Sequence, residues 1–163
     1  MEAKPISDSR SVVVQWMGIE DVNSAGYVHG GVVMKLCDEA AAIAAIRHCG
    51  NRVTTAGMDR VTFLKPINVG DLVTFSSSVN AAWRTSMEVG VRVEAENPRS
   101  RERRHASSAY VTMVALDEDG RPTPVPALSG ADEDEARRGQ EAELRRRNRL
   151  AERNEIIAGR NED

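Results

Sequence analysis

The 163-residue sequence contains few aromatic residues, few lysines and only two cysteines. Aromatic side chains make up 4% of the residues, so the core must be built mainly from Val, Ala, Ile, Leu and Met. The cysteines, Cys37 and Cys49, both fall in a segment with a helical pattern, and a rise of 1.5 Å per residue would separate them by about 18 Å. Because that separation is too long for a disulfide, we expect two free thiols in a reducing compartment.

Motifs for membrane insertion, nucleotide hydrolysis and metal binding are also missing. No stretch approaches the roughly 20 apolar residues that cross a bilayer, and the first residues lack a signal-peptide pattern. We therefore expect a cytoplasmic protein without a membrane partner. The sequence has neither a G-x-S-x-G elbow nor a GK[ST] phosphate loop, and its three histidines are scattered, so no metal site is expected. A formal charge of −3 gives no general attraction to nucleic acid.

Hydrophobic periodicity predicts one long helix and five strands. The expected strands cover residues 10–17, 53–66, 72–82, 86–96 and 105–116, and the expected helix covers 31–48. A Gly/Asn/Ser-rich loop precedes the helix, and short polar turns join the last four strands. One helix followed by hairpin-connected strands is typical of an α+β fold with an antiparallel sheet.

The strand at 86–96 has the clearest alternation of apolar and polar residues. Apolar side chains lie on one of its faces, and the charged residues Glu88, Arg92, Glu94 and Glu96 lie on the other. A single helix covers only one face of a sheet, so the other face or an edge should pair with a second subunit. The sequence thus predicts a homodimer.

The composition changes after residue 128, where charged residues dominate. We divide the chain into an N-terminal arm (1–9), a main domain (10–128) and a charged helical tail (129–163). The tail fits a solvated helix with i,i+4 ion pairs. The arginine-rich run at 145–149 could instead reach a phosphate-bearing ligand.

The start of the predicted helix carries the residues with the most chemical potential. Gly30 and Gly31 let another molecule approach the first-turn N–H groups, which could stabilise an oxyanion. About two turns later Asp38 could serve as a general base for hydrolysis. A purely structural role, with the glycines packed on a strand and Asp38 paired with a neighbour, fits the pattern equally well. A nucleophilic pair of Cys37 and His29 is disfavoured, because eight residues place them on different helical turns.

Four blocks of sequence together resemble the hotdog-fold acyl-CoA thioesterases. The blocks are GYVHGGVVMKLCDEAAAIAAIRHCG, VTTAGMDRVTFLKPINVGD, RTSMEVGVRV and SSAYVTMVALDEDGRPTPVPAL, in this order. The likeness is strongest to the cytosolic brain-type acyl-CoA hydrolases. It implies a sheet wrapped around a central helix, assembly into dimers and often hexamers, and hydrolysis of acyl-CoA without a cofactor other than the coenzyme A of the substrate. Mammalian relatives carry two such domains in tandem, whereas this chain has one, so a symmetric homodimer is expected.

The resemblance also implies residue roles. The catalytic aspartate corresponds to Asp38, and the catalytic asparagine corresponds to Asn23, which would act from the opposite protomer. The carbonyl-polarising amides would lie near Gly30 and Gly31, with His29 either touching the substrate or holding the turn. Contacts to coenzyme A would come from Ala56, Gly57, Met58, Thr85, Ser86 and Met87, and from a tail arginine matching Arg147, or else Arg146 or Arg149.

Two other functions stay open on this sequence. The same fold supports hydratases and dehydratases of acyl thioesters, but these use a histidine paired with an acid, and no histidine follows Asp38 by a few residues. An acyl-CoA-binding regulator is the second alternative. Such regulators carry a DNA-binding helix-turn-helix, for which the roughly ten residues before the first predicted strand leave no room.

Overall fold

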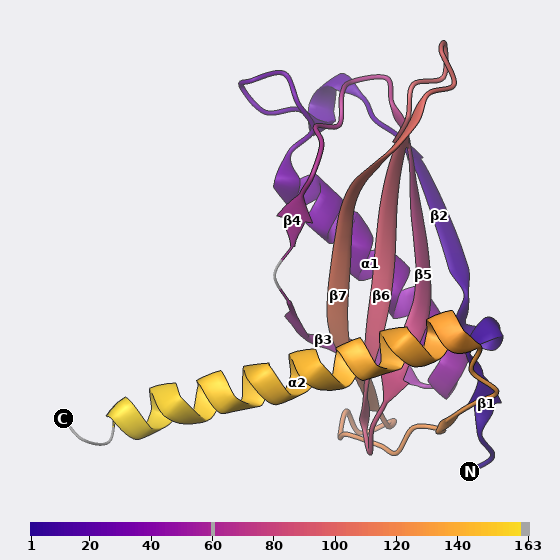
Figure 1. The fold of residues 1–163 in the computed structure, drawn as a ribbon, viewed down its shortest axis with the longest axis vertical. Helices are drawn as coiled ribbons and strands as arrows, with labels where there is room; N and C mark the ends of the chain where they lie inside the picture. The colour runs from indigo at the N-terminus through magenta and orange to yellow at the C-terminus, as the bar shows by residue number, and fades with distance from the viewer. Residues whose placement is uncertain (60, 161–163) are drawn as a thin grey trace.

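The computed structural model describes residues 1–59 and 61–160, so the last three residues of the predicted tail lie outside the described residues (Figure 1). The strands are β1 (Lys4–Pro5), β2 (Ser11–Trp16), β3 (Arg52–Met58), β4 (Thr62–Phe63), β5 (Leu72–Ala82), β6 (Ser86–Glu96), β7 (Arg103–Leu116) and β8 (Leu128–Ser129). The helices are α1 (Gly30–Cys49) and α2 (Glu133–Arg160), with short 3-10 turns at Ile6–Ser9 and Ile19–Asp21. Neither α-helix is long and apolar enough, within the described residues, to cross a bilayer.

The main sheet has the strand order β2-β5-β6-β7-β3, with every neighbouring pair antiparallel and β4 added beside β7. This arrangement confirms the predicted α+β fold. The expected helix is present and is one residue longer at each end. The expectation of a single strand over 53–66 is wrong, because β3 ends at Met58 and β4 covers only Thr62–Phe63. Pro66, which has no N–H to donate, lies beyond β4.

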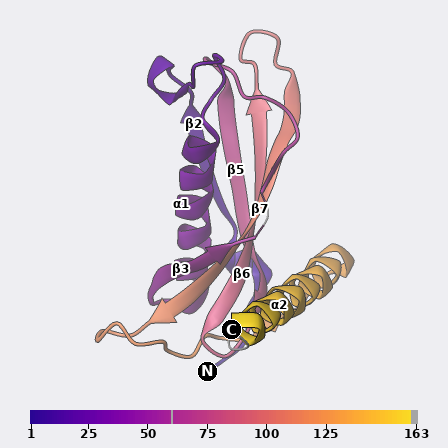
Figure 2. The same ribbon diagram turned by 90° about the vertical axis from the view of Figure 1, so that its left-hand side faces the viewer.

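Helix α1 lies on the inner face of the sheet and contacts all five strands of that order (Figure 2). Its packing face consists of small side chains, and Ala40, Ala41, Ala44 and Ala45 are completely buried. Small residues allow the helix axis to approach the strands closely. The approach is close enough for the Ser77 hydroxyl of β5 to donate a 2.9 Å hydrogen bond to the Ala40 carbonyl.

Helix α2 crosses the outer face of the same sheet (Figures 1 and 2). The helix covers Glu88, which lies on the face of β6 opposite the apolar residues, and this side chain is fully buried. Arg145 of α2 donates two hydrogen bonds to the Glu88 carboxylate, at 2.7 and 3.1 Å, and its guanidinium stacks 3.6 Å from the centre of the Tyr110 ring. Asn80 donates a further bond to Glu88. The buried charge is therefore paired on both oxygens.

The N-terminal arm is packed against the main domain. Strand β1 pairs in parallel with β8, and Ile6 and Ser9 are buried. The Ser9 hydroxyl accepts a bond from the Val79 N–H of β5 at 3.0 Å, and Lys4 donates to the His48 carbonyl at 2.8 Å. The arm is thus fixed beside β5 and the C-terminal end of α1.

The buried ion pair gives a test of the packing of α2. Glu88→Ala would leave Arg145 without its partner in a largely desolvated position, so we expect a loss of about 3 kcal/mol in the free energy of unfolding. The measurement is chemical denaturation at fixed protein concentration, followed by Trp fluorescence, because Trp83 contacts α2. Arg92→Ala, which removes an exposed pair on the same strand, is the control and should cost no more than about 0.5 kcal/mol. Equal effects of the two variants would contradict this account.

Candidate functional site

Asp38 lies on the side of α1 that faces β3, at the edge of the main sheet. Its Oδ1 atom accepts a 2.5 Å hydrogen bond from the hydroxyl of Thr55. The carboxylate is half-buried, between the fully buried Cys37 and the exposed Glu39. No other side chain of residues 1–59 and 61–160 hydrogen-bonds to it. One carboxylate oxygen is thus held in place while the other can accept a proton from water.

Sequence reasoning did not identify Thr55, which a local irregularity of β3 presents to Asp38. Thr55 pairs with Met113 of β7, but the register shifts between Thr55 and Gly57, so Ala56 has no partner in the ladder. A bulge of this kind bends the strand and re-aims its side chains. A sequence signal for Thr55 is its polar hydroxyl at a position that faces the helix, where its neighbours on the adjacent strands are apolar.

The start of α1 offers two backbone donors. The carbonyl oxygen of His29 accepts hydrogen bonds from the N–H groups of Val32 and Val33. The N–H groups of Gly30 and Gly31 find no acceptor among residues 1–59 and 61–160. A Cβ at Gly30 would lie 3.1 Å from the Phe63 ring, whereas a Cβ at Gly31 would meet nothing within 4 Å. A side chain at Gly30 would thus press on the Phe63 ring, whereas Gly31 leaves space beside its amide for an incoming group.

Asn23 lies in the loop before α1 and shares a cavity of about 300 Å³ with Gly30 and Phe63. Its Oδ1 atom accepts hydrogen bonds from the backbone N–H groups of Ala25 and Tyr27, at 2.9 and 3.2 Å. These bonds fix the side chain and leave its NH₂ group as the donor that can reach a ligand. Asn23 and the helix-start amides thus belong to one local cluster.

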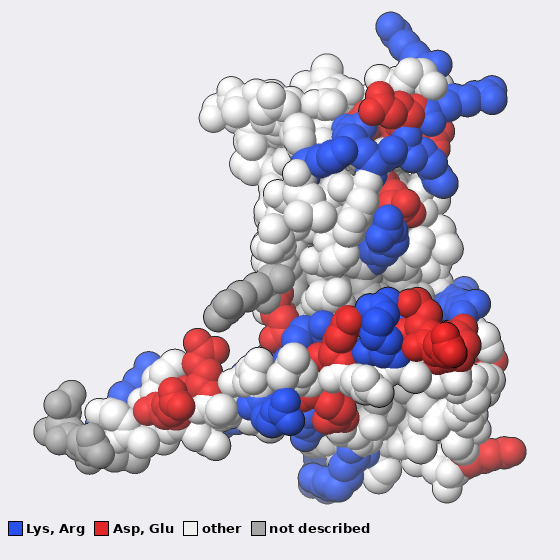
Figure 3. Space-filling model, in the orientation of Figure 1, with Lys and Arg blue, Asp and Glu red and all other residues white. Residues whose placement is uncertain are grey.

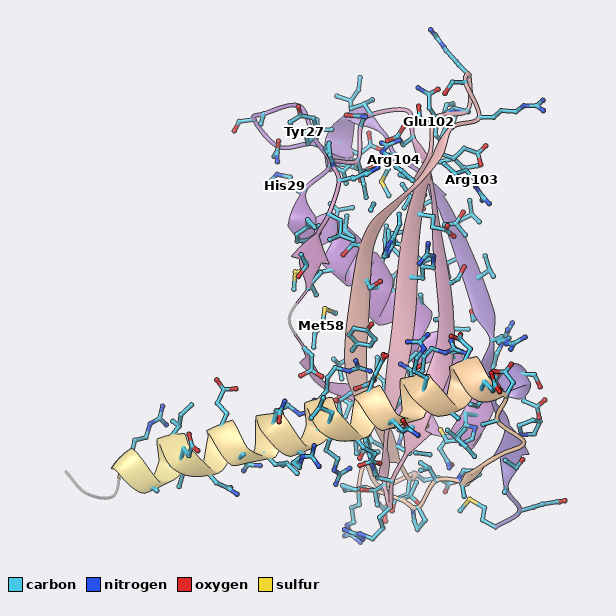
Figure 4. All side chains as sticks on the ribbon, viewed as in Figure 1. Tyr27, His29, Met58, Glu102, Arg103 and Arg104 are labelled. Atoms are coloured by element: carbon cyan, nitrogen blue, oxygen red, sulfur yellow. The ribbon has the colours of Figure 1, made fainter. Side chains whose placement is uncertain are left out.

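The structure does not bring Asn23 and Asp38 together within one protomer. Asp38 follows Gly30 by eight residues, which corresponds to about 12 Å along the helix. Figure 4 shows Tyr27 and His29 beside the helix start, with Met58 well separated from them toward α2. His29 is exposed. The predicted residues therefore form two clusters, one at the helix start and one around Asp38, which Thr55 joins.

The two segments predicted to contact coenzyme A flank the same strand. Ser86 and Met87 of β6 pair with Val114 and Met113 of β7, and Met113 pairs on its other side with Thr55 of β3. The segments are consequently about 10 Å apart across β7. The predicted residues in them are Ala56, Gly57, Met58, Thr85, Ser86 and Met87. The side chain of Met87 is fully buried in the core, so it cannot contact a ligand at the surface.

Arginines of α2 reach both segments. The guanidinium of Arg146 stacks 4.3 Å from the centre of the Trp83 ring, next to the β5–β6 hairpin. Arg149 pairs with Asp59, directly after β3, at 2.7 Å. Arg147 is exposed and forms no ion pair with the described residues. Of the three candidates for a phosphate contact, Arg147 is thus the one whose charge is not already balanced by a carboxylate or placed on an aromatic ring.

The structure gives little support to a catalytic mechanism that uses a cysteine nucleophile or a histidine base. Burial raises the pKa of the Cys37 thiol to about 12, and the neighbouring Asp38 charge adds to the effect. His48 is buried and bonded to the Pro126 carbonyl. Within residues 1–59 and 61–160, no three His, Cys, Asp or Glu side chains gather closely enough to hold a metal ion.

Comparisons with known proteins agree on one family. The sequence model of the Thioesterase superfamily matches residues 25–102. The cytosolic acyl coenzyme A thioester hydrolase of Rattus norvegicus is 39% identical over 146 residues, which cover 88% of this chain but 38% of the rat protein. The chain thus spans little more than a third of the length of that relative.

Solved structures are similar over nearly the whole chain. A hexameric acyl-CoA thioesterase in its apo form is 36% identical, with a TM-score of 0.89 over 93% of this chain and 97% of its own. The acyl-CoA hydrolase of Staphylococcus aureus, in complex with butyryl coenzyme A and coenzyme A, is 34% identical, with a TM-score of 0.88 over 97% of this chain and 96% of its own. Structures of that hydrolase also exist with an aspartate, an asparagine or a threonine changed to alanine.

The burial of Cys37 leads to a chemical prediction. Its pKa of about 12 keeps the thiol protonated at pH 7–9, where an ordinary cysteine begins to ionise, so iodoacetamide should leave Cys37 unmodified in the folded protein. Mass spectrometry after labelling at pH 8.5 measures this directly. The control is the same labelling in denaturant, which should modify Cys37 fully. Rapid labelling of the native protein would show a reactive thiolate and would support the hypothesis that Cys37 is a nucleophile.

Proposed function

Because the chain belongs to the hotdog-fold acyl-CoA thioesterase family, we propose that it hydrolyses an acyl-CoA thioester to a free acid and coenzyme A. The observation that carries the proposal is the Asp38 carboxylate held by Thr55 at the edge of the sheet. The relatives are named as acyl-CoA thioester hydrolases, and one was solved with butyryl coenzyme A. An acyl-CoA with its thioester at this carboxylate is the substrate that fits both facts.

Asp38 takes a proton from water, and the resulting hydroxide attacks the thioester carbonyl. Collapse of the tetrahedral intermediate breaks the C–S bond, and the thiolate of coenzyme A leaves and receives a proton. In the alternative route the carboxylate attacks directly to form a mixed anhydride, which water then hydrolyses. Thr55 serves both routes in the same way, because its bond to Oδ1 fixes the direction of the free oxygen.

The second cluster supplies the electrophilic half of the site from the other protomer. The NH₂ group of Asn23 and the free amides of Gly30 and Gly31 are hydrogen-bond donors gathered at one helix start. Donors in this place stabilise the oxyanion of the intermediate, aided by the positive end of the helix dipole. Since these donors lie far along α1 from Asp38, a dimer in which each protomer contributes one cluster completes the site.

Coenzyme A lies along the β3 edge in this proposal. Its pantetheine arm runs past Ala56, Gly57 and Met58, and the β5–β6 hairpin forms the opposite side through Thr85, Ser86 and the main chain of Met87. Arg147 binds the phosphates, with the fixed Arg146 and Arg149 on either side of it in the sequence. The group is part of the substrate, so no further cofactor is invoked.

The proposed setting is a cytoplasmic homodimer that assembles further. The rat relative is named as cytosolic, and a solved relative is hexameric. A trimer of dimers would reconcile a two-protomer active site with that hexamer. The acyl-chain length is open, and a thiol-release screen over acyl-CoAs from two to eighteen carbons determines it; the absence of release from every one would refute the proposal.

Hydration of an unsaturated thioester is less well supported. That chemistry pairs a histidine with an acid, and no histidine within residues 1–59 and 61–160 bonds to Asp38. Crotonyl-CoA discriminates between the reactions, since hydrolysis releases a free thiol while hydration consumes the double bond.

Replacing the residues of the carboxylate cluster should separate their roles. Asp38→Ala should lower kcat about 10³-fold or more, because the base or nucleophile is lost. Thr55→Val should lower kcat about 10- to 100-fold, the value of one hydrogen bond to a charged group, with little change in KM. Glu39→Ala is the matched control, since Glu39 is the exposed neighbour of Asp38 and should keep normal kcat. Normal turnover by Asp38→Ala would remove Asp38 from the mechanism.

Mixed dimers test whether the two clusters come from different protomers. Asp38→Ala and Asn23→Ala should each be nearly inactive alone. Random mixing after reversible dissociation makes half of the dimers heterodimers, each with one intact site, so activity should return to about a quarter of the normal value. Mixtures that stay inactive would place both residues in one protomer's site.

A further inference from the structure

Helix α2 crosses the sheet strand by strand, in the order of the strands. Its first anchor is Glu135, which pairs at 2.8 Å with Arg10, next to β2. Arg138 then reaches Ser78 of β5, and Arg145 reaches Glu88 of β6 and Tyr110 of β7. The last anchor is Arg149, paired with Asp59 at the end of β3. With this contact the helix has reached the last strand of the path β2-β5-β6-β7-β3.

The helix is longer than the sheet is wide. From Glu135 to Arg149 it advances about 21 Å, close to the roughly 19 Å that four inter-strand spacings occupy. The helix continues to Arg160, and every residue from Leu150 to Arg160 is exposed. Figures 1 and 3 show this part extending past the edge of the sheet with no chain beneath it. It reaches about 16 Å beyond the last anchor, or about three strand spacings.

The face of α2 that packs on the sheet continues into the projecting part. Arg138, Ala142, Arg145 and Arg149 all point to the sheet, and the helical repeat puts Ile156 on the same face, two turns past Arg149. Ile157 lies beside it. Both isoleucines are about half exposed, at 50% and 44%. Two adjacent β-branched apolar residues on a face that elsewhere contacts a sheet indicate a sheet surface that this protomer does not supply.

We propose that this projecting segment, residues 150–160, packs on the outer face of the sheet of a second copy of the chain, joined along β3. Strand β3 is the edge that α2 crosses, and it carries the Asp38–Thr55 cluster. Ile156 lies about 10 Å beyond Arg149 along the helix, or about two strand spacings. It would therefore lie over the second strand of the other copy, counted from the junction of the two β3 strands. By two-fold symmetry each protomer's α2 straps the other. The proposal rests on the dimer of the proposed function, but not on its chemistry.

The charges of the segment favour a protein surface over an anionic one. Glu152 and Glu155 balance Arg153 and Arg160, so the segment carries no net charge. A membrane or nucleic-acid surface would select for excess positive charge. A sheet face is also the surface on which the first four turns of α2 already pack, through the same arginine and small apolar residues.

The first test compares two faces of α2 by sedimentation velocity over a range of protein concentrations. Ile156→Asp/Ile157→Asp should raise the dissociation constant of the dimer about 100-fold or more, since four buried isoleucines are lost per dimer. Leu144→Asp is the control: Leu144 is 47% exposed and lies about 200° around the helix from the buried Ala142, so its variant should associate normally. Ile156 and Ile157 lie past the last anchor of α2, and Leu144 lies on the face of the helix opposite Ala142, so both variants should fold normally.

Each other result of that test overturns the proposal. Normal association of the double variant would leave the segment without a partner copy. An equal loss in Leu144→Asp would show a general effect of charge on the helix. Dissociation of a larger assembly into intact dimers would assign the segment to a contact between dimers. The double variant should still release thiol from acyl-CoA when the protein concentration is far above the dissociation constant of the dimer. Loss of the proposed packing of residues 150–160 is therefore distinguishable from failure of the proposed hydrolase activity.

A cross-linking experiment identifies the surface. A photoreactive benzoylphenylalanine is placed at position 157 or, as control, at 144, in a mixture of ¹⁵N-labelled and unlabelled protein. We expect mixed-isotope cross-links from position 157 to peptides of β3 or β7, and none from position 144. Cross-links that join only two α2 segments, or that form only within one chain, would refute packing on the second sheet.

Discussion

The contact between the alanine face of α1 and the inner face of the sheet determines the rest of the architecture. Because four alanines in two turns are completely buried, the helix lies close enough for a strand hydroxyl, that of Ser77, to bond to a helix carbonyl. Such close packing leaves no space for a polar side chain over the middle strands. Apart from the buried His48 at its end, the polar residues of α1 lie along its flanks, and Asp38 reaches the sheet at its edge, where Thr55 lies beside the bulge in β3. The position of the carboxylate thus follows from the core.

Much of this arrangement can be predicted from the sequence, for an identifiable reason. The helix was located within one residue at each end, because its apolar repeat and the Gly50 stop are local signals. Asp38 and Asn23 were selected through the family resemblance, whereas periodicity alone left Asp38 an even choice between a chemical and a structural role. Thr55 was missed because a bulge is a property of two paired strands, and its partner Met113 lies 58 residues away.

The features that the sequence did not predict depend on long-range contacts. Alternation along β6 correctly separated its two faces but could not show that α2 covers one of them and buries Glu88. The face of α2 gives little hydrophobic signal, since it docks through arginines and Ala142. A helix that is charged on every side is normally a solvated one. Here a desolvated carboxylate and a tyrosine ring on the sheet supply what the helix sequence lacks.

The helices on the two faces of the sheet therefore both place functional features at the same edge, that of β3. On the inner face, the close packing of α1 pushes the only half-buried carboxylate of the helix toward β3. On the outer face, a row of anchors carries α2 across the strands and past β3. The proposed site needs donors that lie about 12 Å along the helix from Asp38, which one protomer does not bring together, and an edge strand such as β3 can pair with a second sheet. The strand that exposes the carboxylate is thus also the one at which a partner could complete the proposed site, so the proposed catalysis and the proposed assembly both depend on the β3 edge.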